Sequence, residues 1–303
     1  MEVIRYHESW RASWDSFIMK SKNGMFQFLR SFLDYHGNKF SDHSLIFMEE
    51  DRVVACLAGH QVEDCYHSHK GLSYGGLVTN IENISQLQQL IGAMEGYLTA
   101  QGFKNYNLRV LPGFMHPINE SLHYLLLENG AAMTNYRLTM LVNLHEEINY
   151  SSTINRKIKK YANSHSTVGL TKDLPAFYQH LADGLNNKYQ VSPLHTLEEL
   201  QLLQNLFPDH LECWEVIING EFAAGCILFM DRNWVKLQYL FSAESNASTL
   251  LLHQLYSIKG RFQYFDLGSS NSLDQHKLNV GNHQFKHFVG GRPKLLYNLT
   301  KDL

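Results

Sequence analysis

The chain of 303 residues lacks the features that mark secreted, membrane-spanning and strongly basic proteins. No apolar run approaches the ~20 residues that a membrane-spanning helix needs. The first residues show no basic stretch followed by an apolar core, so we expect neither a membrane span nor a signal peptide. The formal charge of −3 gives no general attraction to DNA, RNA or anionic lipid. Only four cysteines occur, without metal-type spacing, and we expect reduced, buried thiols in a cytoplasmic protein.

Common cofactor and catalytic motifs are missing as well. The sequence has no G-x-x-x-x-G-K-[ST] or G-x-G-x-x-G nucleotide loop, no G-x-S-x-G serine turn, and no H-E-x-x-H or paired C-x-x-C metal motif. Seventeen histidines are present, and His67 and His69 fall on one face of a predicted strand. No carboxylate or cysteine cluster accompanies them, so we expect no metal site.

What the chain does contain is one structural unit twice. A polar turn leads into a small-residue strand with a cysteine, at Asp51–Cys56 and again at Asn219–Cys226. In each half an amphipathic helix follows, and then a short aromatic strand that begins at Gly102 or at Gly260. A repeated supersecondary unit predicts two like domains packed together, with a ligand site in the cleft between them.

The hydrophobic pattern predicts an α+β fold, with a mixed, mostly antiparallel sheet flanked by helices in each half. We place the domains at residues 1–148 and 149–303. One helix is expected over 26–35, and Thr196 with Glu199 predicts a capping box at the start of another. The segment 268–292 is expected to be rich in loops.

The first stretch with chemical promise is Ser68–Leu77, a glycine-rich passage around a tyrosine. Glycines let the backbone approach a ligand or another strand closely. Two interpretations stay open: a bulged strand with a tight exit, or the wall of a substrate cleft built by Tyr74, Gly75 and Gly76. His69 in this stretch is a candidate general base, because an unperturbed imidazole pKa of about 6.5 suits that task.

The second stretch runs from Tyr264 into a Gly-Gly pair before Arg292. It contains Asp266 at a predicted strand end, and a Gly-Ser-Ser-Asn turn that ends at Asn271. Lys286 follows, framed by two phenylalanines. An ammonium group held in this way can neutralise a phosphate or carboxylate, or stabilise an oxyanion. The alternative is a surface lysine whose stem covers apolar neighbours.

The third stretch is Ser152–Ala162, whose basic residues lie at the start of a helix predicted over 154–165. Its charged face is either simply solvated or, through Arg156, an anion-binding surface.

Taken together, these stretches resemble the FemAB-like branch of the GNAT acyltransferase superfamily, which has two tandem GNAT-like domains in one chain. The resemblance covers nearly the whole sequence. It implies an acyltransferase that transfers an acetyl, acyl or aminoacyl group to an amine or hydroxyl of a sugar, a nucleotide-sugar or a bacterial cell-envelope precursor. It also implies that Lys286 sits at the reacting ester, that Arg156 meets phosphates of the acceptor, and that Tyr239 lines the cleft.

Two departures from that pattern concern the acyl donor. No helical arm interrupts residues 167–210, which argues against aminoacyl-tRNA. The CoA pyrophosphate loop [QR]-x-x-G-x-[GA] is not seen: residues 241–250 contain no glycine and include Glu244, which would oppose pyrophosphate. Acyl-CoA remains one of the candidate donors, and contacts other than this loop would have to bind it.

The sequence thus predicts a small-molecule or cell-envelope acyltransferase with Lys286 and His69 as catalytic groups. Its predicted substrate-binding residues are Arg156, Tyr74, Gly75, Gly76, Tyr239, Asp266 and Asn271. Two alternatives remain: a non-catalytic module of the same fold that binds a glycan or nucleotide-sugar, and an aminoacyl-tRNA-dependent peptidoglycan-type ligase.

Overall fold

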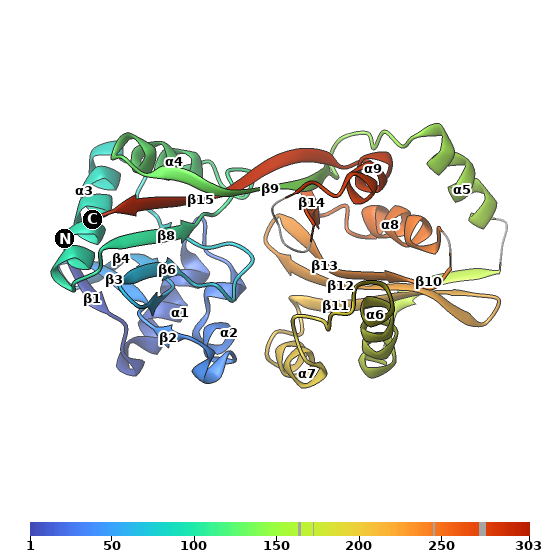
Figure 1. The fold of residues 1–303 in the computed structure, drawn as a ribbon, viewed down its shortest axis with the longest axis horizontal. Coiled ribbons are helices and arrows are strands. Elements are labelled where there is room, and N and C mark those ends of the chain that lie inside the picture. The colour runs from blue at the N-terminus through green and yellow to red at the C-terminus, as the bar shows by residue number, and fades with distance from the viewer. Residues whose placement is uncertain (163–164, 172, 245, 273–276) are drawn as a thin grey trace. The chain divides into compact units, whose positions relative to one another are not determined.

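The chain folds into two compact units (Figure 1). The first unit consists of Met1–Tyr136 and Leu296–Leu303, and the second of Arg137–Leu295. The structure, a computed structural model, describes residues 1–162, 165–171, 173–244, 246–272 and 277–303.

Two long strands connect the units along the chain. The strand β9 (Ala132–Asn143) begins in the first unit and ends in the second, and β15 (Arg292–Asp302) returns to the first. The first unit therefore consists of two separate stretches of the chain. A single boundary, such as the predicted one between residues 148 and 149, does not separate the two units. A cleft shared by both units stays a prediction.

The first unit contains two groups of strands. One lies in the order β1-β3-β4-β7, and the other in the order β15-β8-β6-β5-β2. Neighbouring strands run antiparallel except for the parallel pair β6–β8. The elements are β1 (Glu2–Arg5), η1 (Glu8–Trp10), α1 (Arg11–Lys20), η2 (Phe26–Phe28), α2 (Arg30–Asp34), η3 (Gly37–Lys39), β2 (Ser41–Asp42), β3 (Leu45–Glu49), β4 (Arg52–Leu57), β5 (Gly59–Val62), β6 (Cys65–Ser68), β7 (Leu77–Thr79), α3 (Ile84–Ala100), β8 (Asn105–Arg109) and α4 (Ile118–Glu128).

The second unit has its strands in the order β10-β11-β12-β13-β14-β9, again antiparallel except for one pair, β13–β14. The helix α8 lies on one face of this sheet, and α6 and α7 lie on the other (Figure 1). The elements are α5 (Ser152–Ala162), β10 (Ser166–Leu170), α6 (Leu174–Tyr189), α7 (Leu197–Leu206), β11 (Leu211–Ile218), β12 (Glu221–Asp231), β13 (Trp234–Ser242), α8 (Ala247–Ile258), β14 (Tyr264–Ser269) and α9 (Val280–Phe288).

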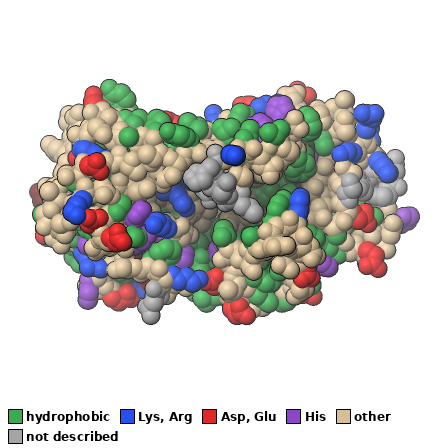
Figure 2. Space-filling view, in the orientation of Figure 1, with side chains coloured by type: hydrophobic (Ala, Val, Ile, Leu, Met, Phe, Trp, Pro, Cys, Tyr) green, Lys and Arg blue, Asp and Glu red, His purple; other side chains and the backbone are tan. Residues whose placement is uncertain are grey.

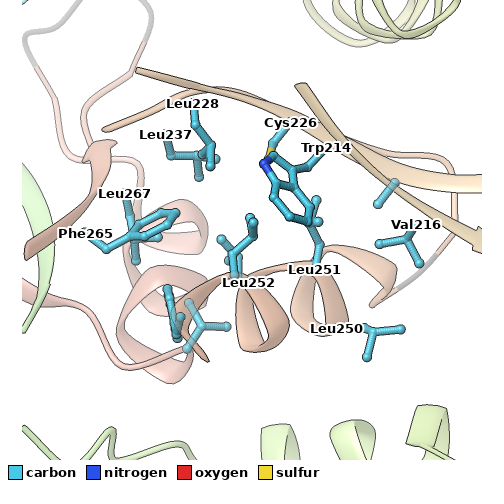
Figure 3. Close-up of a cluster of buried hydrophobic side chains, with 14 of the residues drawn as sticks. Trp214, Val216, Cys226, Leu228, Leu237, Leu250, Leu251, Leu252, Phe265 and Leu267 are labelled. Atoms are coloured by element: carbon cyan, nitrogen blue, oxygen red, sulfur yellow. The ribbon is translucent and has the colours of Figure 1, made fainter. Parts of the chain in front are cut away.

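The core of the second unit forms between α8 and one face of the sheet (Figure 3). Alternate residues of each strand point to the same face, and here those residues are leucine, valine, phenylalanine and cysteine. Leu228 on β12, Leu237 on β13 and Leu267 on β14 meet Leu251 and Leu252 of α8. Full burial of each such side chain stabilises the fold by about 1.5–3 kcal/mol.

The mixed α+β fold is the predicted one, and the strand register shows how closely the two halves correspond. Cys56 pairs with Ile46 on the preceding strand, and Cys226 pairs with Trp214 in the same way. In the second unit, β12 pairs with one continuous strand, β13, whose register shifts beside Leu228. In the first unit, the partner strand is interrupted at the corresponding point, between β6 and β7.

Two of the sequence-based expectations were wrong. The segment 26–35 is not one helix, because Leu29 is extended between η2 and α2. Hydrogen bonds from α1 fix this break: the Trp14 indole donates to the Phe28 carbonyl at 2.7 Å, and the Asp15 carboxylate accepts from the Arg30 amide at 2.8 Å.

The second wrong expectation is the loop-rich segment before Arg292, which contains the helix α9. Its sequence has few apolar residues, so hydrophobic spacing does not reveal it. The helix begins because the Asn279 side chain accepts a hydrogen bond from the Asn282 amide at 3.0 Å. It is held in place because Phe285 and Val289 pack on the core of the second unit.

Candidate functional site

The candidate site lies where the parallel strands β13 and β14 stop pairing. Their register runs through Trp234↔Tyr264 and Val235↔Phe265 and ends at Lys236↔Asp266. Val235, Leu237, Phe265 and Leu267 all belong to the core on the α8 side. Because strand residues alternate between faces, Lys236 and Asp266 lie on the opposite face, which α6 and α7 cover in part (Figure 1).

A β-bulge in β13 brings Tyr239 onto the same face. Ile227 pairs with Tyr239 and Leu228 with Leu237, so Gln238 is the extra residue. Without it, strict alternation would put Tyr239 on the core face. The side-chain Oε1 of Gln238 is buried and has no hydrogen-bond partner in the described part of the chain.

Asp266 is held rigidly in this site. Its side chain is 1% exposed, and its Oδ1 accepts hydrogen bonds from the Thr139 hydroxyl and, at 2.8 Å, from the Gly268 amide. Gly268 has a φ of +77°, which strains any residue with a Cβ. The strand end therefore turns sharply and fixes the carboxylate at the same time.

Lys286 reaches this turn from α9. Its side chain is 8% exposed, and its ammonium donates to the carbonyls of Gly268 at 3.0 Å and Ser269 at 2.6 Å. An ammonium carries three N–H groups, and the third has no hydrogen-bond partner among the residues that the structure describes. The predicted lysine is thus buried and positioned, and it is not a solvated surface side chain.

The electrostatic environment lowers the pKa of Lys286 to about 8, from its ordinary value of 10.5. Burial is the main cause because it penalises the charged form, and the positive charge of Lys236 adds to it. The carboxylate of Asp266 acts in the other direction. Near neutral pH the side chain is mostly charged, and only a small rise in pH removes the proton.

The charged residues Lys236, Asp266 and Lys286 belong to the second unit, and the first unit has uncharged or different residues at the corresponding positions. The pair that corresponds to Lys236↔Asp266 is His67↔Asn107, the last parallel pair of β6 and β8. The amide of Asn298 donates to Asn107 at 2.7 Å, as the Thr139 hydroxyl does to Asp266.

The counterpart of Lys286 is a leucine. Leu126 accepts a hydrogen bond from the Ala131 amide at the end of α4, as the Lys286 carbonyl does from the Gly291 amide at the end of α9. Leu126 is buried in the apolar core of the first unit. The halves therefore share a backbone frame, but the charged residues occur in one of them.

Lys236 and Thr139 were missed by the sequence interpretation. Lys236 carried a weak signal, since it is a charged residue between two apolar ones on a predicted central strand. Thr139 carried none, because only folding brings β9 next to β14.

Asn271 and Tyr239 have mainly structural contacts. The side chain of Asn271 accepts from the Leu138 amide at 2.9 Å and from the Ser269 hydroxyl at 3.2 Å, and so it supports the turn after β14. The Tyr239 hydroxyl lies 2.7 Å from the His195 Nδ1 and accepts from the His195 amide at 3.1 Å. Burial raises the Tyr239 pKa to about 12, so the phenol stays protonated.

Arg156 lies elsewhere in the second unit, on α5. This helix packs on α8, so it is on the opposite side of the sheet from Tyr239 and Asp266. Arg156 is exposed, and its guanidinium lies 3.5 Å from the Thr153 hydroxyl. Lysine and arginine side chains gather over α5 in Figure 2, while Ile154 faces the core. The structure does not bring Arg156 together with Lys286.

The glycine-rich passage belongs to the first unit. Tyr74 is 1% exposed, and a Cβ on Gly75 would lie 2.8 Å from both the Arg109 carbonyl and the Ser68 hydroxyl. Gly76 has a φ of +103°. These observations favour the interpretation as a tight strand exit, in which the glycines allow close backbone packing.

His69 also lies in the first unit, in a layer of aromatic rings. Its ring centroid is 4.9 Å from that of His36, 4.7 Å from that of Phe40 and 5.5 Å from that of His60. The side chain is 2% exposed, and burial lowers its pKa to about 3. A neutral imidazole is the form that a base requires, but this one is enclosed.

Among the described residues, no group of three or more histidine, cysteine, aspartate or glutamate side chains is arranged to hold a metal ion. Within the same residues, no helix has the length and apolar character needed to cross a membrane.

The fold is similar to those of several solved structures. One is titled FemX: it has 11% sequence identity and a TM-score of 0.69, with 100% of this chain and 98% of that chain covered. Another is the C-terminal domain of a putative lysylphosphatidylglycerol synthetase from Agrobacterium fabrum, with 12% identity, a TM-score of 0.62, and 97% and 92% covered. A third is an acetyltransferase of the GNAT family from Colwellia psychrerythraea, with 11% identity, a TM-score of 0.56, and 100% of both chains covered.

No protein-family model matches the sequence, and no curated protein has a matching sequence. At such low identities the structural likeness defines the fold. The chain therefore has a GNAT-type fold. Its similarity in fold to FemX agrees with the resemblance to the FemAB-like branch seen in the sequence.

Proposed function

We propose that this protein is an acyl- or aminoacyltransferase whose reaction centre lies at the end of β14, with Lys286 as its catalytic ammonium. The observation that carries the proposal is the buried Lys286, held by two carbonyls with its third N–H directed to neither. Acyl transfer passes through a tetrahedral oxyanion, and a preorganised cation in a dry site stabilises that charge.

Proteins with a similar fold support a transfer reaction. They include an acetyltransferase and a putative lysylphosphatidylglycerol synthetase. On this basis we propose that the acceptor is an amine or hydroxyl of a sugar, a nucleotide-sugar or another cell-envelope precursor. The reaction is direct: the acceptor forms a bond to the acyl carbon, the donor leaves with the electron pair of its C–O or C–S bond, and the acceptor proton passes to a base.

The start of α8 supports a donor other than one held by the usual CoA loop. The amides of Ala243 and Glu244 both donate to the Ala223 carbonyl, at 2.9 and 3.0 Å. They are therefore used by the fold and are not available to cradle a pyrophosphate. The side chain of Glu244 is exposed beside them and repels anions; Ser245, also in the predicted loop region, lies outside the described residues. Aminoacyl-tRNA stays an alternative donor.

The candidate general base is His69, which is buried in the first unit. Its role as the base stays a prediction. A His69→Gln variant that folds normally but loses activity would assign that role to His69.

The test is acyl transfer with labelled acetyl-CoA and with aminoacyl-tRNA, against a panel of sugar nucleotides and envelope precursors. With a productive pair in hand, Lys286→Met should reduce turnover by about 10²–10³, the usual effect of losing one oxyanion-stabilising group. Lys294→Met is the matched control, because Lys294 is exposed in the same unit. A folded Lys286→Met protein with turnover close to that of the wild type would remove Lys286 from the reaction.

A second candidate function is a non-catalytic module that binds a glycan or nucleotide-sugar. The amides of Ala243 and Glu244 favour it, since both donate to the Ala223 carbonyl and neither can hold a donor pyrophosphate. Thermal unfolding with acetyl-CoA and with sugar nucleotides discriminates the two, because a ligand at 100 times its Kd stabilises by about 2.7 kcal/mol. Stabilisation by sugar nucleotides without any transfer would support the binding module.

A further inference from the structure

The second unit contains a cavity that is separate from the Lys286 site. It has a volume of about 290 Å³, which is room for about ten water molecules at ~30 Å³ each. Its lining comes from the three connections that precede β11, β13 and β14. Two of the lining residues, Arg232 and Phe262, come just before the first residues of β13 and β14. Lys286 contacts the other end of β14, so the cavity is a second site.

Hydrogen bonds hold the three connections together. The His210 carbonyl accepts from the Met230 amide at 2.8 Å, and the His210 Nδ1 lies 2.8 Å from the Met230 carbonyl. The Asn233 carbonyl accepts from the amides of Gln263 and Tyr264, at 2.8 and 3.0 Å. The walls of the cavity are therefore fixed before a ligand binds, which lowers the entropy cost of binding.

Two side chains of opposite charge line this cavity and do not pair with each other. Asp209 and Arg261 are both exposed, and neither has an ion pair among the residues that the structure describes. The Arg261 guanidinium lies 4.7 Å from the centre of the Phe262 ring, a contact that favours its position at the cavity wall. Two further charged residues, Asp231 and Arg232, lie 3.8 Å apart and make other contacts within the protein, so the fold uses them.

We propose that this cavity binds a free α-amino acid with an apolar side chain, whose carboxylate meets Arg261 and whose ammonium meets Asp209. A simple anion would be attracted by the guanidinium and repelled by the carboxylate, and a simple amine the reverse, whereas a zwitterion satisfies both. Met230 and Phe262 are buried and give the lining its apolar part. The inference does not rest on the proposed function, because it involves no transfer step.

The first unit supplies an internal comparison. There the Lys104 amide donates to the Asp64 carbonyl at 2.9 Å, in the same place as the Gln263 amide in the second unit. Two residues earlier in the chain, Gly102 therefore occupies the position of Arg261. The same backbone frame folds with a glycine at this position, so folding alone does not require the arginine.

The test is isothermal titration of the full wild-type chain with L-leucine, N-acetyl-L-leucine and L-leucinamide. The second compound lacks the ammonium and the third lacks the carboxylate, and at about pH 6.5 the free amines are protonated. Leucine should bind with a dissociation constant of about 1 mM or lower. It should bind about tenfold or more tightly than each analogue, the effect of one charged partner. Absence of leucine binding, or an analogue that binds as tightly as leucine, overturns the proposal.

Variants then locate the bound leucine. Arg261→Gln and Asp209→Asn should each weaken leucine binding by about tenfold or more. Lys294→Gln and Glu221→Gln are the matched controls, because both positions are exposed in the same unit, and they should bind leucine like the wild type. Wild-type affinity in both cavity variants would place leucine elsewhere and overturn the proposal.

A last variant separates this cavity from the proposed reaction centre. Lys286→Met should bind leucine as tightly as the wild type, because Lys286 does not line the cavity. A loss of leucine binding in folded Lys286→Met would assign the amino acid to the end of β14 and contradict this inference.

Discussion

At the scale of single residues, Lys286 shows how position changes the chemistry of a common side chain. An exposed lysine at this position would be an ordinary surface side chain, because a solvated ammonium is screened and carries no fixed geometry.

 The Lys286 ammonium is instead buried, which reduces screening, and two carbonyl partners fix its position. The same burial makes its protonation sensitive to pH in a way that can be measured.

The lowered pKa of Lys286 predicts a pH dependence of stability. The folded-state pKa of about 8 lies below the ordinary value of 10.5, so between these pH values the unfolded chain binds more protons. The free energy of unfolding should therefore rise as the pH increases from about 8 to about 10.5, through this group. Urea denaturation at several pH values should show this rise in the wild-type protein and a smaller one in Lys286→Met. The same slope in both proteins would contradict the assigned pKa.

At the scale of elements, glycines decide how a helix can approach the sheet. Gly225 on β12 lies on the face that α6 covers, and a Cβ there would be 2.6 Å from the Phe177 ring. The other face of the same strand carries Ala224 and Cys226, which are in the core. The absence of a side chain at this position lets α6 pack closely against the sheet.

Gly225→Ala should therefore destabilise the second unit by about 1–3 kcal/mol, the usual cost of overpacking a core. Gly169→Ala is the matched control on β10, because a Cβ there meets nothing within 4 Å. Chemical denaturation of both variants is the measurement. Equal stabilities of the two variants would show that α6 shifts without cost.

The capping box at the start of α7 is an element that local sequence specified. The Thr196 hydroxyl accepts from the Glu199 amide at 3.2 Å, and the Glu199 carboxylate accepts from the Thr196 amide at 2.9 Å. Both partners lie within one turn, so no distant contact is needed. The break at Leu29 is the opposite case, because its hydrogen bonds come from α1.

At the scale of the whole molecule, buried histidines give the first unit a sensitivity to acid. His60 and His69 are 1% and 2% exposed, and both ring nitrogens of His60 have no hydrogen-bond partner in the described part of the chain. Burial lowers the pKa of His60 to about 4, and the charges of His67, Lys70 and Arg109 act in the same direction while Asp42 opposes them.

The sign of the effect follows from these values. The folded-state pKa of His60 is about 4, below the ordinary 6.5, so the unfolded chain takes up the proton first as the pH falls. Stability should decrease from about pH 6.5 towards pH 4, by about 1.4 kcal/mol per pH unit for each fully buried imidazole. His60→Leu should reduce this slope, and His145→Leu, at an exposed position, should leave it unchanged. A slope that His60→Leu does not alter would place the acid sensitivity elsewhere.

The sequence by itself determined the class of fold and the repeat, and it singled out Lys286 as a candidate catalytic residue. Periodic apolar residues, turn glycines and the capping box act over a few neighbours, so they can be recognised along the chain. Lys286 was found in this way, through the residues that frame it and the family pattern. Only the tertiary structure decided what surrounds Lys286. Asp266, Thr139 and Lys236 come from three strands that folding aligns, and one bulged residue sets which face Tyr239 occupies. Tertiary contacts also enclosed His69 among aromatic rings, since burial depends on residues far apart in the chain.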